Sequence, residues 1–329
     1  MKILYGVQGT GHGHISRARE IVPTLQELAD VDILVSGKHL KMTLEGIPVW
    51  NRTGITMSYD AHGKVSYLRT LTGLRPVRFI RDVQALDLSG YDLVISDYEP
   101  ISAWAAKKQR VQCIGMSHQA SFLSPLSPRP PHKSRMAESI LSHFAPVSKA
   151  IGFHFLRYDK FIEPPVIRRE VQELNPVEEP RVTVYLPSYH HEFLATFFQK
   201  VPELEWFIFS PYCNEEIDAG NVRFRPIGNR GFLESLERSA GVLTGGGFES
   251  CAETMYLGKK LMSIPIQRQY EQLCNAAALE AMGVSVVYSI EHHFADQLRE
   301  WLFEKESVPL PEIANTRAIL HDLLQGLQE

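Results

Sequence analysis

Long hydrophobic runs and tracts of one charge are both missing from this 329-residue sequence. No uninterrupted apolar run approaches the roughly 20 residues that a membrane-spanning helix needs. The formal net charge is only -4 and no long Lys/Arg tract occurs, so the chain has no overall positive field for capturing a polyanion. These absences argue against a membrane-spanning protein and against a nucleic-acid partner.

Cysteine is also scarce, and its few copies are scattered. The four cysteines are Cys113, Cys213, Cys251 and Cys274, and no two of them form a CxxC pair. This spacing fits neither a zinc site nor a disulfide scaffold, so we expect reduced thiols in the core. The opening MKILYGV is too short for the apolar region of a signal peptide. We therefore expect a cytoplasmic protein.

The composition is that of an ordinary folded chain, with 44% hydrophobic and 22% charged residues. Single cores stop growing at roughly 250 to 300 residues, so a chain of this length favours two domains. Residues 160–180 are rich in charge and proline without any period, as expected of an interdomain linker. We expect one domain over 1–165 and a second over 166–329, with the last helix a candidate to pack back on the first domain.

Apolar runs alternate with helix-like stretches in both halves, which predicts an α/β fold of two doubly wound, Rossmann-like domains. In the first half, strands are expected at 2–7, 31–37, 91–97 and 110–117, and helices at 15–29 and 101–110. In the second half, strands are expected at 181–187, 205–211, 221–226, 240–246 and 259–265. The helices expected there cover 191–200, 231–238, 248–257, 270–281 and part of 315–329.

A glycine-rich loop, GVQGTGHGHISRA (6–18), follows the first expected strand. Glycines between a strand and a helix let a ligand approach the helix N-terminus, where free N–H groups favour anions. The spacing is GxGxG rather than the dinucleotide fingerprint GxGxxG, so a nicotinamide enzyme is disfavoured. The loop also places His14 at the start of the helix, where a neutral imidazole could accept a proton from a substrate hydroxyl near pH 7.

A second glycine-rich turn, LTGGGFES (243–250), again lies between an expected strand and an expected helix. Three consecutive glycines with Ser250 just inside the helix form a plausible pyrophosphate cradle. The residues that follow keep a recognisable order: Glu253, Gly258, a strand ending in Pro265, and then QRQYEQLCNAAALEAMGV.

This stretch, 240–288, resembles the donor-binding half of nucleotide-sugar glycosyltransferases of the two-domain GT-B architecture. It is most similar to families 28 and 1, the branch of the peptidoglycan GlcNAc transferase and the UDP-glycosyltransferases. The matching positions are Gly246, Gly247, Ser250, Glu253, Gly258, Pro265, Glu271, Gln272, Asn275 and Ala276. The resemblance extends to GHISRA (13–18), LVISD (93–97), MSHQ (116–119) and YLPS (185–188).

The resemblance implies two Rossmann-like domains facing across a cleft, with the acceptor on the first and the nucleotide sugar on the second. It implies that His14 is the general base and that Asp97 orients its imidazole. The donor would be held by Ser188, Ile227, Asn229, Gly246, Gly247, Ser250, Glu253, Glu271 and Gln272. The acceptor would meet Gly11, Gly13, His118 and Gln119. The implied reaction moves a sugar from a nucleotide-sugar donor, first of all a UDP-sugar, to an acceptor hydroxyl with inversion, and it needs neither a cofactor nor a metal.

Several alternatives stay open at this point. His12 competes with His14 for the role of base, and Asp97 could merely cap the next helix. Three departures from the family pattern, at Gly245, Pro187 and Glu271, leave the diphosphate contacts and the donor sugar undetermined. A metal reading of the HGH triplet or of His190 and His191 lacks a third spaced ligand. A nucleotide-sugar epimerase of the same fold and a non-catalytic binder of nucleotide sugars are the two other functions.

One more segment bears on partners. YLRTLTGLRPVRFIRD (67–82) sets Arg69, Arg75, Arg78 and Arg81 among apolar residues. Such a basic amphipathic stretch could lie on an anionic membrane surface or grip a lipid-linked or small glycan acceptor. An ordinary solvated helix explains it equally well, so we expect a cytoplasmic protein with a possible peripheral membrane contact.

Overall fold

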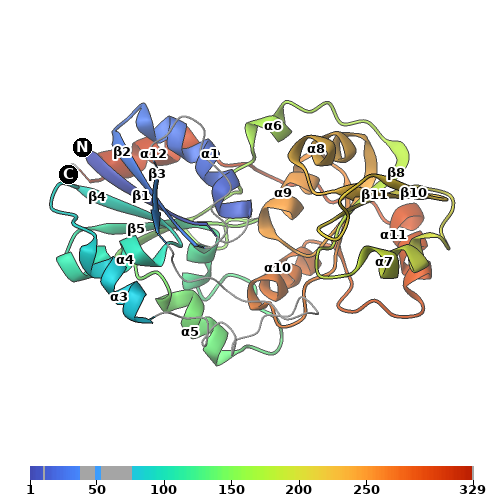
Figure 1. The fold of residues 1–329 in the computed structure, drawn as a ribbon, viewed down its shortest axis with the longest axis horizontal. Helices are drawn as coiled ribbons and strands as arrows, with labels where there is room; N and C mark the ends of the chain where they lie inside the picture. The colour runs from blue at the N-terminus through green and yellow to red at the C-terminus, as the bar shows by residue number, and fades with distance from the viewer. Residues whose placement is uncertain (10–11, 38–48, 53–75, 328–329) are drawn as a thin grey trace.

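A computed structural model describes residues 1–9, 12–37, 49–52 and 76–327. Its strands form two seven-stranded sheets, one in each half of the chain. The strand orders are β3-β2-β1-β4-β5-β6-β7 and β10-β11-β9-β8-β12-β13-β14. Figure 1 shows the two sheets side by side, with helices packed around each, so the elements are arranged in two α/β halves.

The N-terminal sheet is parallel throughout its described pairs. Its strands are β1 (Lys2–Gln8), β2 (Asp30–Ser36), β3 (Val49–Arg52), β4 (Leu93–Asp97), β5 (Cys113–Ser117), β6 (Lys149–Phe153) and β7 (Ile162–Glu163). The helices are α1 (His12–Gln26), α3 (Pro76–Ala85), α4 (Pro100–Gln109) and α5 (Arg135–His143), with a 3-10 turn η1 (Gln119–Leu123). Near-continuous burial of β1 and β4 is what a parallel sheet covered on both faces requires.

The C-terminal sheet is parallel except for its edge strand β10 (Ile217–Ala219), which runs antiparallel to β11 (Val222–Pro226). The other strands are β8 (Glu179–Tyr185), β9 (Glu205–Ser210), β12 (Ser239–Thr244), β13 (Lys260–Ser263) and β14 (Ser285–Val286). The helices are α7 (His191–Phe198), α8 (Asn229–Arg238), α9 (Phe248–Tyr256), α10 (Tyr270–Ala281) and α11 (Phe294–Glu304).

The segment between the two sheets is packed rather than free. It carries a short helix, α6 (Arg169–Gln172), and its apolar side chains Val166, Ile167 and Val171 are buried in a core that both halves share. The sequence predicted an interdomain linker here, without a regular period. Burial was not predicted, because the apolar side chains Val166, Ile167 and Val171 follow neither a helical nor an alternating spacing.

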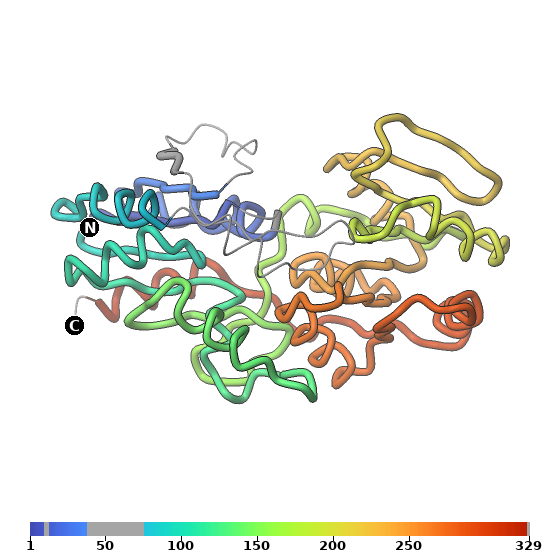
Figure 2. Tube along the Cα trace, turned by 60° about the horizontal axis from the view of Figure 1, so that its bottom comes forward, coloured from blue at the N-terminus to red at the C-terminus, as the bar shows by residue number. Residues whose placement is uncertain are grey.

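The last helix, α12 (Thr316–Gln325), packs against α1 at the opposite end of the chain. Leu320 and Leu324 enter the same core as the α1 side chains, and Arg317 forms an ion pair with Glu27. Both views show α12 in red beside the blue N-terminal segment (Figures 1 and 2). The chain therefore ends on the half in which it began.

Most elements predicted from the sequence are confirmed, with shifted ends. The first helix begins at His12 rather than at residue 15, so His14 lies inside it. Four edge strands were missed, namely β3, β7, β10 and β14, as were the interior strand β6 and the helices α5 and α11. Among the described residues, none of the helices combines the length and the apolar character that crossing a bilayer demands.

Candidate active site

His14 and Asp97 meet at the carboxyl end of the N-terminal sheet. Asp97 is the last residue of β4, which pairs with β1 so that Val7 lies opposite Asp97, and α1 begins four residues after β1 ends. His14 Nδ1 lies 2.7 Å from Asp97 Oδ1. With the Nδ1 proton donated to that carboxylate, Nε2 is left with the lone pair that a base needs.

Asp97 is fully buried and stays ionised because Arg17 and the His14 ring both bind it. Burial alone would raise its pKa, but Arg17 and His14 outweigh burial and hold the pKa below its usual value. The next residue, Tyr98, has φ 54°, a left-handed conformation that a bulky residue rarely adopts, and its ring stacks on the His14 ring at 6.4 Å. Backbone strain of this kind is often concentrated at functional sites.

Arg17 completes this group, and the sequence analysis did not single it out. Its Nε donates to Asp97 Oδ2 at 2.9 Å and its Nη2 donates to Asp97 Oδ1 at 2.6 Å. The signal was present: Arg17 follows His14 by three positions, which places both side chains on one face of a helix.

Glu249 reaches this cluster from the other domain, since it lies in the first turn of α9 and forms an ion pair with Arg17. Gly13 makes the approach possible. A Cβ on Gly13 would lie 2.3 Å from Glu249 Oε2, a distance at which atoms collide. Gly13 thus meets a side chain of the C-terminal domain rather than open solvent.

The turn Gly245–Gly247 connects β12 to α9 at the carboxyl end of the second sheet. Gly246 has φ +78°, which favours glycine, and a Cβ there would lie 3.0 Å from Ser263 Oγ. Gly247 is the N-cap of α9, so the first N–H groups of that helix are directed toward this turn. Such a helix start suits an anion.

Two hydroxyl groups lie beside the turn. Ser250 Oγ donates to Gly247 O at 3.1 Å, and Ser263 Oγ lies against Gly246. Ser263 Oγ and the Ser188 Oγ that follows β8 are buried, and neither has a hydrogen-bond partner among the residues that the structure describes. A buried hydroxyl without a partner is costly, so both are available to a polar ligand.

Glu253 lies on α9 and is only 3% exposed. Its two carboxylate oxygens accept from Arg168 Nε at 2.6 Å and Nη2 at 2.8 Å. Burial raises the pKa of Glu253, and Arg168 opposes that rise only in part. Arg168 also donates to Asn229 Oδ1 at 3.0 Å, so two of the predicted donor residues share one partner from the interdomain segment.

His118 and Gln119 lie between the two domains. His118 Nε2 is 2.8 Å from Asn275 Oδ1, and the Asn275 amide donates to the carbonyl of Gly246 at 3.1 Å. Gln119 Nε2 donates to Glu271 Oε2 at 3.1 Å. Gln119 thus contacts the predicted donor residue Glu271 directly, and His118 is connected to Gly246 through Asn275.

Of the remaining predicted residues, Gln272 lies against the glycine turn, since a Cβ on Gly245 would be 3.6 Å from Gln272 Oε1. That oxygen accepts from the backbone N–H of Ile266 at 2.9 Å, and Ile227 is exposed. Gly11 lies outside the described residues, as do Arg69 and Arg75. Of the 67–82 segment, the described part belongs to α3, where Val77 and Ile80 are exposed. A membrane contact through this segment stays a prediction.

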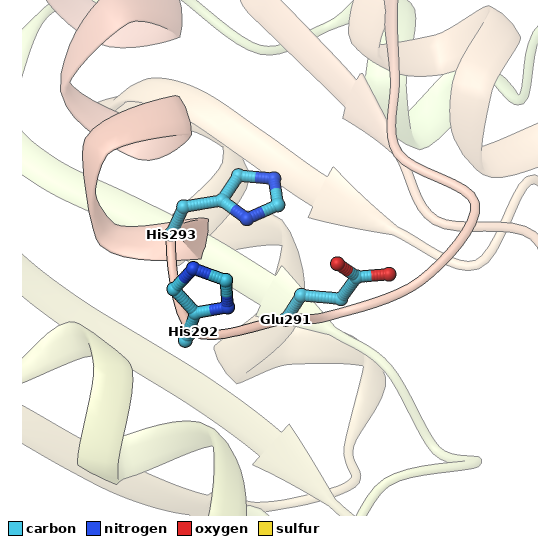
Figure 3. Close-up of side chains that lie close together, drawn as sticks. All are labelled: Glu291, His292 and His293. Carbon is cyan, nitrogen blue, oxygen red and sulfur yellow. The ribbon is translucent and has the colours of Figure 1, made fainter.

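Among the described residues, one group of three potential metal ligands lies close together, made of Glu291, His292 and His293. All three are exposed and follow one another on the loop that leads into α11 (Figure 3). This loop is at the end of the C-terminal domain that faces away from the N-terminal domain (Figure 1). It does not adjoin the site built from His14 and the Gly245–Gly247 turn.

Comparison with known proteins identifies the family of this chain. Residues 1–305 match the family described as Glycosyl transferase family 1. The chain belongs to glycosyl transferase family 1. No curated protein sequence matched it.

Solved structures similar to this glycosyltransferase agree on the fold at low sequence identity. The spinosyn forosaminyltransferase SpnP shares 14% identity at a TM-score of 0.61, with 100% of both chains covered. MurG of Acinetobacter baumannii shares 12% at 0.58, with 99% of both chains covered. SsfS6 of Streptomyces sp. SF2575, complexed with thymidine diphosphate, shares 13% at 0.61, with 99% of both chains covered.

The glycosyltransferase thus has the GT-B fold, with two Rossmann-like domains. Contacts between the domains run through the two glycine-rich elements: Gly13 meets Glu249, and the His118–Asn275 pair leads to Gly246. A group that can accept a proton, His14, therefore lies on one domain beside a turn on the other that suits an anion.

Proposed function

We propose that this glycosyltransferase moves a sugar from a nucleoside-diphosphate donor, first of all a UDP-sugar, to an acceptor hydroxyl with inversion and without a metal requirement. The observation that carries the proposal is the His14–Asp97 pair, contacted by the domain that bears the Gly245–Gly247 turn. Glycosyl transfer needs a base for the acceptor hydroxyl, which loses a proton, and a binding site for the diphosphate, which leaves as an anion. A base on one domain and a turn suited to an anion on the other would meet these two needs.

In the proposed reaction, His14 Nε2 accepts the proton of the acceptor hydroxyl while the hydroxyl oxygen attacks the anomeric carbon. The bond from that carbon to the diphosphate oxygen breaks, and the nucleoside diphosphate leaves. Asp97 accepts the Nδ1–H and stabilises the imidazolium that forms. A single displacement of this kind inverts the anomeric centre.

The leaving diphosphate would be stabilised by the N-terminus of α9 and by nearby hydroxyls. Backbone N–H groups at a helix start and the helix dipole supply fixed positive potential at the point where negative charge develops. Ser188 and Ser250 add hydroxyl donors, and Glu253 would accept from ribose hydroxyls at the lone pairs that Arg168 leaves free. Thymidine diphosphate in SsfS6 shows that a similar fold holds a nucleoside diphosphate in that protein.

The test is a thermal-shift titration with UDP, TDP, GDP, ADP and NAD at matched concentrations. A ligand that binds only the folded chain stabilises it by about 2.7 kcal/mol at 100 times its Kd, which raises Tm by several degrees. We expect a selective rise with one nucleoside diphosphate. If none of the five ligands raises Tm, the proposed donor site is contradicted.

Product analysis separates this proposal from the two other functions. Incubation with the donor sugar alone would yield an isomerised sugar if the protein were an epimerase. Saturable binding without turnover on any acceptor would indicate a non-catalytic binding protein. Transfer to a glycan or small-molecule acceptor, lipid-linked or free, supports the proposal.

A further inference from the structure

Arg17 contacts both members of the His14–Asp97 pair. Its Nη2 lies 2.6 Å from Asp97 Oδ1, the oxygen that also binds His14, and 3.1 Å from His14 Nδ1 itself. Because Nδ1 carries the proton shared with Asp97, the close Arg17 nitrogen places a positive charge beside the ring rather than a hydrogen bond to it. A cation at this distance opposes protonation of His14.

The counter-charge for Arg17 comes from the opposite domain. Arg17 Nη1 donates to Glu249 Oε1, and Glu249 follows Gly247 by two residues at the start of α9. Arg17 is almost fully buried, so its charge is not dispersed by solvent and depends on these two carboxylates. Because Glu249 and the Gly245–Gly247 turn belong to one segment, the position of the C-terminal domain that brings the turn toward His14 also brings Glu249 to Arg17.

Three other groups face this cluster, and none of them is an alternative source of charge. The Tyr98 ring stacks on His14, and the Phe153 ring lies 5.9 Å from the Arg17 guanidinium. Tyr5 lies beneath on β1, and burial followed by the charge of Asp97 raises its pKa well above the usual value, so it stays neutral. Among the described residues, the charged groups in contact with this cluster are therefore Asp97, Arg17 and Glu249, and the charge of Glu271 acts on its Tyr98 side.

We propose that Arg17 is a positioning residue that fixes the Asp97 carboxylate for His14, and that its ion pair with Glu249 makes the proton affinity of His14 depend on the apposition of the two domains. With Glu249 in place, the charge of Arg17 is shared and more of the Asp97 charge acts on the imidazolium. With Glu249 withdrawn, Arg17 draws on Asp97 alone and His14 becomes a weaker base. The inference rests on the proposed role of His14 as the base.

The experiment follows the pH titration of the His14 ring by NMR in the full chain with carbon-13-labelled histidine. The His14 signal is assigned by its loss in His14→Gln. We expect Arg17→Gln to raise the titration midpoint by about one pH unit, because a neighbouring cation is removed. We expect Glu249→Gln to lower the midpoint by roughly half a unit, because the counter-charge of Arg17 is removed.

Opposite signs are the decisive readout, because loss of a purely structural contact would not move the two midpoints in opposite directions. In the double variant, Glu249→Gln should shift the titration midpoint by less than it does alone, since Arg17, the partner of Glu249, is already absent. Matched controls are Arg299→Gln and Glu300→Gln on α11, at the far end of the C-terminal domain (Figure 2). Both should leave the midpoint within about 0.1 pH unit of the unsubstituted protein.

Shifts of the same sign, or midpoints that do not move, would overturn the inference. If Arg17→Gln does not fold, Glu249→Gln decides alone: a lowered midpoint supports the inference and an unchanged one overturns it. The titration needs no sugar transfer, so the two proposals fail separately. Opposite shifts without any nucleotide response would leave the charge coupling standing and remove the transferase chemistry, and a nucleotide response with unmoved midpoints would do the reverse.

Discussion

The two halves of the site are built from different materials. On the N-terminal domain, His14, Asp97 and Arg17 form a compact set of ionisable side chains, each already bound to another. On the C-terminal domain, the corresponding element is a run of three glycines at the start of α9, with a buried hydroxyl beside it. In the proposed reaction, the first half moves a proton and the second receives an anion.

The difference shows how each domain treats buried charge. The charges of the N-terminal half neutralise one another before any substrate arrives, so the geometry of the base is fixed in advance. Beside Gly246, Ser263 Oγ has no partner among the described residues. Unpaired buried polar atoms also occur in the N-terminal half, among them Tyr5 Oη, Gln119 Oε1 and Ser121 Oγ, so the contrast concerns the charged side chains rather than buried polarity as a whole.

The largest effect that would break this comparison is the loss of His14. His14→Ala should lower the transfer rate by about a thousandfold, because general-base catalysis contributes roughly 10²–10⁴. The affinity for the nucleoside diphosphate should stay within about twofold, since the donor half does not use the imidazole. The measurements are transfer rate at saturating donor and nucleotide binding by calorimetry.

His12→Ala is the matched control, because it removes the other histidine of the same loop. Loss of transfer in His12→Ala but not in His14→Ala would assign the base to His12. Equal loss of nucleotide binding in both variants would contradict the division of labour between the domains.

A smaller effect concerns the stability that the buried charges supply. Asp97→Asn leaves Arg17 buried without its main counter-charge, which should cost about 3 kcal/mol of unfolding free energy at pH 7. Because the folded pKa of Asp97 lies below its usual value, this stabilisation is present above about pH 3.8 and is lost as the pH falls through the folded pKa. Urea unfolding at a series of pH values measures the difference in unfolding free energy between Asp97→Asn and the unsubstituted protein.

The exposed Asp322 of α12 provides the control, since Asp322→Asn should change stability by less than about 0.5 kcal/mol. If the stability difference between Asp97→Asn and the unsubstituted protein does not narrow toward low pH, the destabilisation does not come from the loss of the ionised carboxylate.

The sequence predicted the local half of this site and missed the part that depends on the partner domain. Glycine turns and strand ends are local signals, and the adjacency of β1 and β4 brings His14 to Asp97 as predicted. Arg17 bonds to Glu249 across 232 positions and Arg168 to Glu253 across 85, and no local pattern encodes such pairs. Arg168 was missed for a second reason, because it lies in the segment interpreted as an interdomain linker without a regular period.

The missed strands have a similar explanation. β7 and β14 contain two residues each, too few to show any period, and β10 is an exposed edge strand. Helix α11, by contrast, buries Phe294, Leu298 and Trp301 at helical spacing, so its pattern was available in the sequence. Periodicity therefore missed elements too short or too exposed to show it, and α11 was overlooked although its pattern was present.

The smallest expected effect sharpens the comparison from the donor side. Glu253→Gln should weaken nucleotide binding roughly tenfold, the cost of about one charge-assisted hydrogen bond, while transfer at saturating donor stays nearly unchanged. Burial raises the pKa of Glu253, so the affinity of the unsubstituted protein should fall as the pH is lowered through a range above the usual Glu value. In Glu253→Gln that dependence should flatten.

Glu170→Gln, which alters another carboxylate beside Arg168, should leave affinity within about twofold. A steep pH dependence that persists in Glu253→Gln would assign the ribose contact to another group.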